Sequence, residues 1–198
     1  KLFLRLIIRT KIYTLAKDQK TICMKMISPY LSFETERLIL KPFEISDAPF
    51  LLILLNSPKW LQYIGDRNVH TEAEAVEYIQ VRMITQLEKL GYGNNLVIEK
   101  ESNIPIGACG LYERPGLPIV DIGFAFLQEY EGKGYGYEAA SRLLKAGKED
   151  FELQKVCAIT TKENVTSQKL IDKLGLKFIK IITIEGDKEN LMYFEKEL

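Results

Sequence analysis

The pattern of apolar and polar residues divides most of this 198-residue chain into short strands and amphipathic helices. Strands are expected where apolar residues alternate with polar ones or form short runs between turn residues, and helices where apolar residues recur every three or four positions. The predicted strands are RLILKPF (37–43), NNLVIEKE (94–101), IPIGACGLYE (104–113), IVDIGFAFL (119–127), KVCAITTKEN (155–164), LKFIKIITIEG (176–186) and ENLMYFEKE (189–197). Helices are predicted in ISDAPFLLILLNSP (45–58), from Thr71 to Gly91, over 135–151 and over 166–175.

Local signals mark several helix ends. Thr71 followed by Glu74 is typical of a capping box, and Gly91 supplies a C-terminal stop. The helix before it takes Ser46 or Asp47 as its N-cap and ends at Pro58.

The order of elements indicates the fold class. Turn residues at 102–103 and 115–118 separate the three middle strands, which favours an antiparallel meander. We therefore expect an α+β fold, a mixed and mostly antiparallel sheet flanked by helices on both faces.

Charge separates the first residues from the rest. Residues 1–25 carry seven Lys or Arg and one Asp, whereas the remainder carries 20 basic and 26 acidic residues. We interpret residues 1–25 as a basic N-terminal extension that precedes a native start at Met24 or Met26, and residues 26–198 as a single domain. The apolar run within the N-terminal extension is too short and too charged to span a bilayer. The zero net charge of the chain gives no reason to expect a nucleic acid or an anionic membrane as partner.

The cysteines and the histidine limit the chemistry further. Cys23, Cys109 and Cys157 are scattered, and the last two lie in apolar runs, so we expect reduced, buried thiols in a cytoplasmic protein. His70 is the only histidine, which leaves no His/Cys cluster for a metal.

The stretch QEYEGKGYGYEAA (128–140) is the strongest candidate for a binding site. It matches neither a Walker loop, which needs Gly-Lys-Ser/Thr, nor a dinucleotide fingerprint, since Tyr137 stands where the third glycine belongs. It does place Gly132 and Gly134 between a strand and a helix that starts near Tyr135, with Gly136 directly after that start. Unpaired N–H groups at such a helix start favour an anion, and glycine lets phosphate oxygens approach them, with Lys133 adding charge. A pyrophosphate-bearing cofactor fits best, and a tight turn with no ligand is the alternative.

This arrangement resembles the GNAT superfamily of N-acetyltransferases. The strand, EGKGYGYEAA, the helix, VCAITTKEN and VTSQKLIDKLGLKF resemble its acyl-CoA-binding half, while ETERLILKPFEISDA and IPIGACGLYERPGLPIVDIGFAFLQEYEGKGYGYEAA are similar to the branch that includes ribosomal-protein-alanine acetyltransferases. The resemblance covers about residues 33–198 and implies transfer of an acetyl group from acetyl-CoA to a primary amine by direct attack in a ternary complex. The alternative is a non-catalytic acyl-CoA-binding or sensing module on the same fold.

The resemblance also implies which residues bind the cofactor. The backbone of 132–137 would hold the pyrophosphate: Gly132, Lys133, Gly134, Tyr135, Gly136 and Tyr137. Phe126, Leu127 and Gln128 would pair with the pantetheine amides in a V-shaped gap beside strand 120–127, with a bulge and splay that Gly123 permits. Glu131 stands where the family usually has Arg or Gln, so the chain departs from the family pattern at that position.

The Asn-x-x-Ser segment extends this assignment. Asn164 would contact the pantetheine arm and Ser167 would lie near the sulfur, where its hydroxyl could donate to the leaving thiolate. Capping of the short helix by Asn164 or Thr166 is the structural alternative. Ile171 occupies the position at which many relatives have a tyrosine.

For the general base, Asp121 is the first candidate because it is a lone carboxylate in an apolar strand, where burial would raise its pKa. The alternative for Asp121 is a paired carboxylate on the outer face. Glu113 is the second candidate for the base, and we expect His70 to lie at the surface or to line the substrate pocket.

Trp60, Tyr63 and Arg67 are the candidate acceptor residues, against the alternative of a core tryptophan and a solvated arginine. The acceptor itself stays open among an N-terminal alanine, a lysine, a polyamine, an antibiotic amine and an amino acid, and the oligomeric state is open between monomer and homodimer.

Overall fold

A computed structural model describes residues 30–184 and 190–198. The described chain forms one eight-stranded sheet in the order β1-β2-β3-β4-β5-β6-β8-β7. The strands are β1 (Phe33–Glu34), β2 (Leu38–Pro42), β3 (Asn94–Glu99), β4 (Ile104–Tyr112), β5 (Asp121–Phe126), β6 (Lys155–Thr161), β7 (Lys177–Ile182) and β8 (Leu191–Glu197). All neighbours pair antiparallel except β5 and β6, so the expected α+β class with a mostly antiparallel sheet is confirmed.

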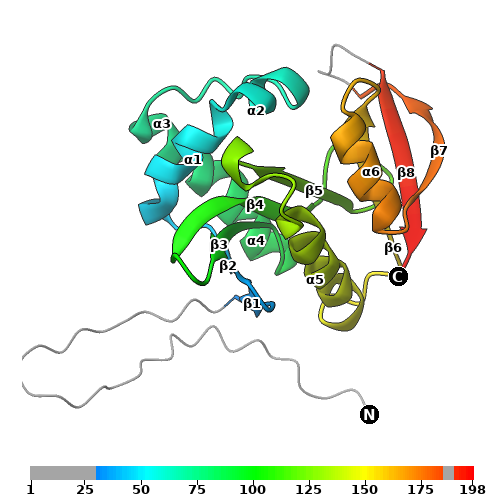
Figure 1. The fold of residues 1–198 in the computed structure, drawn as a ribbon, viewed down its shortest axis with the longest axis horizontal. Helices are drawn as coiled ribbons and strands as arrows, with labels where there is room; N and C mark the ends of the chain where they lie inside the picture. Colours follow the sequence, from blue (N-terminus) through cyan, green and yellow to red (C-terminus); the bar gives the residue numbers. More distant parts are fainter. Residues whose placement is uncertain (1–29, 185–189) are drawn as a thin grey trace, which may run out of the picture.

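Helices cover both faces of this sheet, as Figure 1 shows. On one face lie α1 (Ala48–Leu55), α2 (Pro58–Tyr63), α3 (Glu72–Tyr78) and α4 (Thr85–Leu90), and on the other α5 (Tyr135–Glu149) and α6 (Val165–Lys173). Each face has its own apolar core: Leu51, Leu54 and Ile79 belong to the first, and Leu143 and Ile171 to the second.

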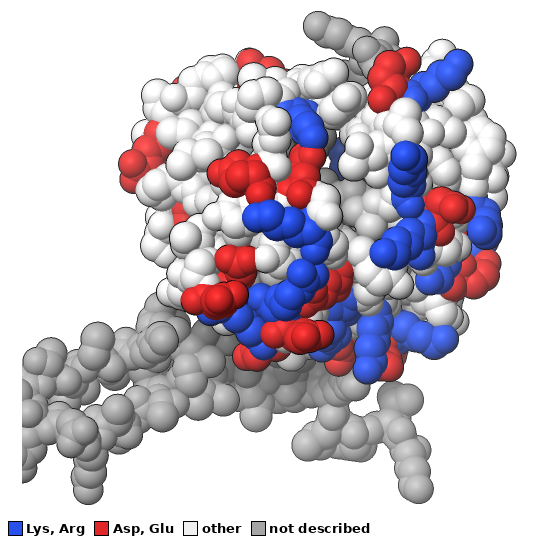
Figure 2. All heavy atoms as spheres, viewed as in Figure 1, with Lys and Arg blue, Asp and Glu red and all other residues white. Residues whose placement is uncertain are grey.

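The feature that shapes the site is the separation of β5 from β6. Their parallel pairing is recorded at one residue pair, Asp121 with Cys157, whereas β5 pairs regularly with β4 along its whole length. The Leu127 N–H donates to the Ile106 carbonyl at 3.0 Å. Because main-chain groups alternate in direction along a strand, those of Phe124 and Phe126 then point away from β4, into the gap toward β6. Figure 2 shows a furrow between the two halves of the molecule along this line.

Several boundaries differ from the prediction. The two-residue strand β1 was not predicted, and Pro58 does not only end a helix, since it starts α2 inside the expected joining loop. The predicted Thr71–Gly91 helix has its capping box and its left-handed Gly91, but a π-helical segment, Ile79–Ile84, interrupts it. Asp47 does precede α1, but its carboxylate makes no N-cap hydrogen bond to that helix and accepts from Lys41 Nζ at 2.7 Å instead.

The expected strand bulge is also placed differently. The register shift in this part of the sheet falls between Val97 and Ile98 of β3, and the β4–β5 pairing is regular through Gly123. A side chain at Gly123 would instead meet the Tyr112 ring at 3.0 Å, so this glycine makes room for an aromatic ring.

Some predictions fall outside the described residues. These are the interpretation of residues 1–25, Cys23, and the parts of the last two predicted strands within 185–189. Among the helices that are described, none is both long and apolar enough to cross a membrane.

Candidate active site

The glycine loop joins the open end of β5 to α5. After a single 3₁₀ turn, Gln128–Tyr130, the chain passes through Gly132 and Gly134, whose φ angles are 72° and 85°. These left-handed conformations favour glycine over every other residue. Gly134 is the N-cap of α5 and has no side chain with which to cap it. Within the described chain, the N–H groups of residues 132–137 have no hydrogen-bond partner, so they form a cluster of donors at the positive end of a helix.

An arginine directly before β2 holds this loop in place. The Arg37 guanidinium donates to the Lys133 carbonyl at 3.1 Å and to Glu138 Oε2 at 2.7 Å, and it lies 4.5 Å from the centre of the Tyr135 ring. Thr35 Oγ1 donates to the other Glu138 oxygen at 2.6 Å. Burial alone would raise the pKa of Glu138, but the hydrogen bonds from Thr35 and Arg37 outweigh it and lower that pKa. Sequence reasoning missed this brace because Arg37 and Glu138 lie 101 positions apart.

Charges of both signs surround the loop. Lys133 Nζ lies 5.2 Å from the centre of the Tyr130 ring, and Lys173 Nζ of α6 lies 4.4 Å from that of Tyr137. Glu131 forms an ion pair with Lys59 of α2. Figure 2 shows basic and acidic side chains intermixed over this face, so an anion there would be recognised locally and not by a broad positive field.

The Asn-x-x-Ser segment begins α6 on the opposite side of the gap. Asn164 Oδ1 accepts from the Ser167 main-chain N–H at 3.0 Å, which is the capping role considered as an alternative. The half-buried Ser167 hydroxyl makes no hydrogen bond to any described residue. Ile171 is buried in the core with α5, so its apolar side chain supplies no hydrogen-bond donor to the gap.

Asp121 lies at the base of the gap, where β5 and β6 separate. It is 1% exposed, and its Oδ2 accepts from Arg114 Nε at 3.0 Å and lies 2.9 Å from Arg114 Nη2. Its Oδ1 is buried and has no hydrogen-bond partner among the described residues. Burial is the main cause that raises the pKa of Asp121, and the Arg114 charge and hydrogen bond act against it. Asp121 is thus a paired carboxylate, but a buried one and not one on the outer face.

The other candidate base, Glu113, has a different setting. Its carboxylate is exposed and forms an ion pair with Lys89 of α4. His70 is also exposed, with its Nδ1 3.3 Å from Asn56 Oδ1. Only Asp121 combines burial with a position at the strand separation.

The candidate acceptor residues lie on and after α2. Trp60 packs against the apolar core under α1 and α3, and its Nε1 is buried without a partner in the described chain. Tyr63 is half-buried at the end of α2, and Arg67 is exposed. None of the three lines the neighbouring cavity of about 370 Å³, which is formed by Ile53, Asn56, Ser57, Pro58, Lys59, Phe126, Leu127, Gln128 and Glu129.

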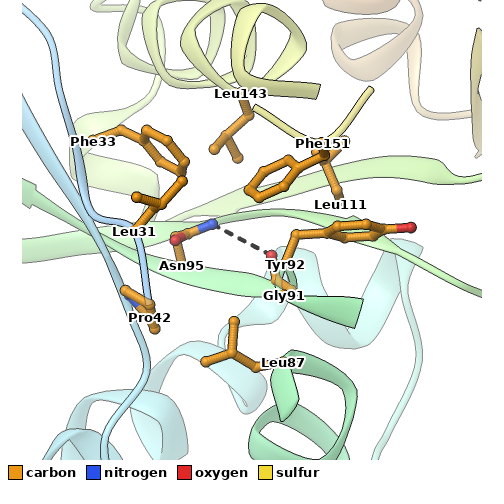
Figure 3. Close-up of a pocket in the computed structure, with 11 residues that line it drawn as sticks. Leu31, Phe33, Pro42, Leu87, Gly91, Tyr92, Asn95, Leu111, Leu143 and Phe151 are labelled. Atoms are coloured by element: carbon orange, nitrogen blue, oxygen red, sulfur yellow. Dashed lines mark hydrogen bonds between the residues drawn. The ribbon is translucent and has the colours of Figure 1, made fainter. Parts of the chain in front are cut away.

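A second cavity is a packing gap. Figure 3 shows it between Phe33, Leu87, Leu143 and Phe151, away from the glycine loop, with the Asn95 amide turned to a main-chain carbonyl. Its volume of about 10 Å³ has room for about one water molecule, so we assign it no ligand.

The thiols and acidic side chains add no further reactive centre. Cys109 and Cys157 are buried free cysteines, and burial raises the pKa of both, to about 12 for Cys157. They are therefore protonated at neutral pH and poor nucleophiles. Over residues 30–184 and 190–198, no group of three or more His, Cys, Asp or Glu side chains is placed to hold a metal ion.

Comparison with known proteins agrees with this geometry. Residues 37–177 match the acetyltransferase (GNAT) domain family. The chain is 30% identical over 147 residues to the uncharacterized N-acetyltransferase p20 of Bacillus licheniformis, covering 72% of this chain and 80% of that protein.

Solved structures show the same fold. A GNAT-family acetyltransferase from Bacillus anthracis superposes with a TM-score of 0.70 at 24% identity, covering 84% of this chain and 98% of that one. A ribosomal-protein-S5-alanine acetyltransferase from Vibrio fischeri gives a TM-score of 0.70 at 20% identity, with 84% and 96% covered. The match to the family spans well over half of the sequence, and the separated strands and the glycine loop agree with it. The chain is therefore a member of the GNAT family of N-acetyltransferases.

Proposed function

We propose that the protein transfers an acetyl group from acetyl-CoA to a primary amine, either a protein N-terminus or a small-molecule amine, in a ternary complex. The observation that carries this proposal is the set of unpartnered N–H groups at residues 132–137, next to the open edge of β5. A diphosphate suits these donors. The amides of a pantetheine arm suit the outward-facing main-chain groups of Phe126, whereas the Leu127 N–H and the carbonyls of Leu127 and Gln128 already pair within the described chain. Asn164 and the Lys133 ammonium would complete the cofactor contacts.

The chemistry needs no covalent intermediate on the protein. The neutral amine attacks the thioester carbonyl, a C–N bond forms, the C–S bond breaks, and one proton leaves the nitrogen. Binding both reactants side by side supplies a large part of the rate, with effective molarities up to about 10⁵–10⁸ M. The protonated thiols of Cys109 and Cys157 have no role in this step.

Asp121 is the proposed acceptor of that proton. Arg114 occupies its Oδ2, whereas the buried Oδ1 has no hydrogen-bond partner among the described residues and is the proposed proton-accepting atom, directly or through a water. On the other side, the Ser167 hydroxyl donates a hydrogen bond to the departing thiolate, which takes its proton from solvent. Glu113 is the alternative base, and its exposed ion pair with Lys89 would have to open first.

The acceptor enters from the α2 side in this proposal. Trp60, Tyr63 and Arg67 lie there, and the acidic excess of residues 26–198 favours an amine that arrives as a cation. The likeness to a ribosomal-protein acetyltransferase makes a peptide with a free N-terminus the first acceptor to test.

Turnover measurements test this proposal directly. Release of CoA thiol from acetyl-CoA would be followed with a panel of N-terminal peptides, lysine peptides, polyamines and amino acids, and acetylated products identified by mass spectrometry. We expect release to depend on at least one amine class. Binding of acetyl-CoA without turnover would favour the non-catalytic alternative, and no thermal stabilisation by CoA would contradict cofactor binding altogether.

A further inference from the structure

Glu131 places a negative charge beside the loop that is proposed to hold a diphosphate. It immediately precedes residues 132–137, and its main-chain N–H donates to the Gln128 carbonyl, which fixes it at the end of the 3₁₀ turn. A carboxylate near a bound diphosphate raises the energy of the complex by Coulomb repulsion. The Glu131 carboxylate alone would therefore weaken the binding of a diphosphate at this loop.

In the folded chain, a lysine 72 positions away in the sequence neutralises this carboxylate. Lys59 Nζ contacts Glu131 Oε2, and the two side chains are 42% and 26% exposed. Lys59 is the second residue of α2, directly after Pro58, and both line the cavity of about 370 Å³ beside Phe126, Leu127 and Gln128. Its ammonium thus lies between the cavity, the end of β5 and the glycine loop.

The neighbouring charges leave Lys59 as the partner of Glu131. Glu129 also lines this cavity, Lys133 Nζ lies over the Tyr130 ring, and Lys173 Nζ lies over the Tyr137 ring. Arg37 is close as well, but Glu138 neutralises it. Without Lys59, the Glu131 carboxylate next to residues 132–137 would lose the cation with which it forms an ion pair in the described chain.

We infer that Lys59 is a cofactor-binding determinant, a counter-charge from α2 that neutralises Glu131 and so allows the loop to accept the CoA diphosphate. This inference rests on the proposed function. It makes a specific claim about coupling: the contribution of Lys59 to CoA affinity exists because Glu131 is present. A residue that touched the diphosphate independently would show no such dependence.

A double-mutant cycle on CoA affinity tests the claim. Isothermal titration with CoA would compare the wild type with Lys59→Met, Glu131→Gln and the double variant, since methionine keeps the apolar stem of lysine and removes its charge. We expect Lys59→Met to raise the Kd about tenfold. Glu131→Gln should bind at least as tightly as the wild type, and the double variant should return to within about threefold of it. The Lys59→Met defect should shrink at high salt.

Matched variants control for general charge effects. Lys145→Met removes an exposed lysine on α5 that pairs with Glu149, and Glu149→Gln removes the exposed carboxylate of the same pair. Both should change the Kd less than their counterparts.

Two results would overturn the inference while leaving the proposed function intact: a Lys59→Met Kd within twofold of wild type, or a double variant that is weaker than Glu131→Gln by the same factor as Lys59→Met is weaker than the wild type. Absence of CoA binding by the wild type would instead contradict both.

Discussion

The two sides of the gap between β5 and β6 present different kinds of group, main-chain groups on one side and side chains on the other. The proposed cofactor side has main-chain groups: left-handed glycines, the start of the 15-residue helix α5, and a brace from Arg37 and Glu138. The proposed acceptor side has side chains on short elements, a six-residue α2 and a helix interrupted by a π segment. A common cofactor can be held by groups that every residue possesses, whereas an acceptor must be chosen by side chains. We therefore expect the first side to be recognisable across the family and the second to vary with substrate.

Replacing Asp121 should give the largest effect, because it lies where the two sides meet. Asp121→Asn is expected to lower kcat by about 10²–10⁴-fold, the usual contribution of a general base, with the Kd for CoA nearly unchanged. Steady-state kinetics and titration with CoA would measure the two quantities. Glu113→Gln is the control, and a larger loss there than at Asp121 would transfer the role of base to Glu113.

The pH profile sharpens this prediction. Since burial raises the pKa of Asp121, activity should increase as the pH rises through that raised value, where the carboxylate ionises. Arg114→Met removes the charge that lowers this pKa, so the acidic limb of kcat/KM should move to higher pH. The sign for stability is opposite: the unfolded state ionises first, so Asp121 should make the folded state less stable as the pH rises between the ordinary and the raised pKa. If the acidic limb of kcat/KM stays at the same pH in Arg114→Met, the assignment of Asp121 as the base is contradicted.

A substitution in the glycine loop should weaken CoA binding more than it slows the acetyl transfer. Gly134→Val forces a β-branched residue into a left-handed conformation and adds a Cβ that would lie 3.4 Å from Arg37 Nη2. We expect the Kd for CoA to rise about 100-fold. Gly91→Val carries a similar backbone penalty at the end of α4, where a Cβ would meet nothing within 4 Å, and serves as the control for stability. Equal loss of CoA affinity in both variants would refute a local role for the loop.

Ser167 allows the helix cap to be separated from the chemistry. Asn164 caps α6 through the main-chain N–H of Ser167, so Ser167→Ala leaves that hydrogen bond in place and removes only the hydroxyl. Turnover should fall about tenfold, the value of one lost hydrogen bond to a charged group. Asn164→Ala should instead cost about 1 kcal/mol of stability. Single-turnover kinetics and thermal melts would distinguish them, and unchanged turnover in Ser167→Ala would remove Ser167 from the mechanism.

The brace behind the loop should have the smallest effect. Glu138→Gln keeps the shape and removes the charge that pairs with Arg37, and because Arg37 is 43% exposed we expect a loss of only about 1 kcal/mol in the free energy of unfolding. The lowered pKa of Glu138 means that its stabilisation is present above the ordinary carboxylate pKa and is lost as the pH falls through the lowered one. Urea unfolding at neutral and acidic pH would measure both. A variant that is equally destabilised at every pH would argue against an electrostatic brace.

The sequence predicted those parts of the fold that local pattern controls. Signals within a few residues predicted the capping box at Thr71, the helix end at Gly91, the three-strand meander and the helix that follows the glycine loop. The two-residue β1 and the helix at Pro58 were missed, since a strand that short has no period and a proline reads equally as an end or a start.

The site divides in the same way. The glycines at 132, 134 and 136 predicted a loop suited to an anion, and the resemblance extended this prediction to Tyr137, whereas the charged partners around the loop could not be predicted. Glu138 with Arg37, Asp121 with Arg114 and Glu131 with Lys59 are pairs created by folding. Arg114 is only seven positions from Asp121, yet only the turn between β4 and β5 brings them together. Charge pairing across a fold has no sequence period, so these contacts needed the structure.

The central claim is that main-chain amides of residues 132–137 bind the CoA diphosphate. Amide ¹H–¹⁵N NMR spectra recorded during a titration with CoA test it most directly. The account predicts the largest chemical-shift changes at Gly132, Gly134 and Gly136, with further changes at Phe124 and Phe126 on the open edge of β5. Saturable binding that leaves these amides unmoved while others shift would contradict it.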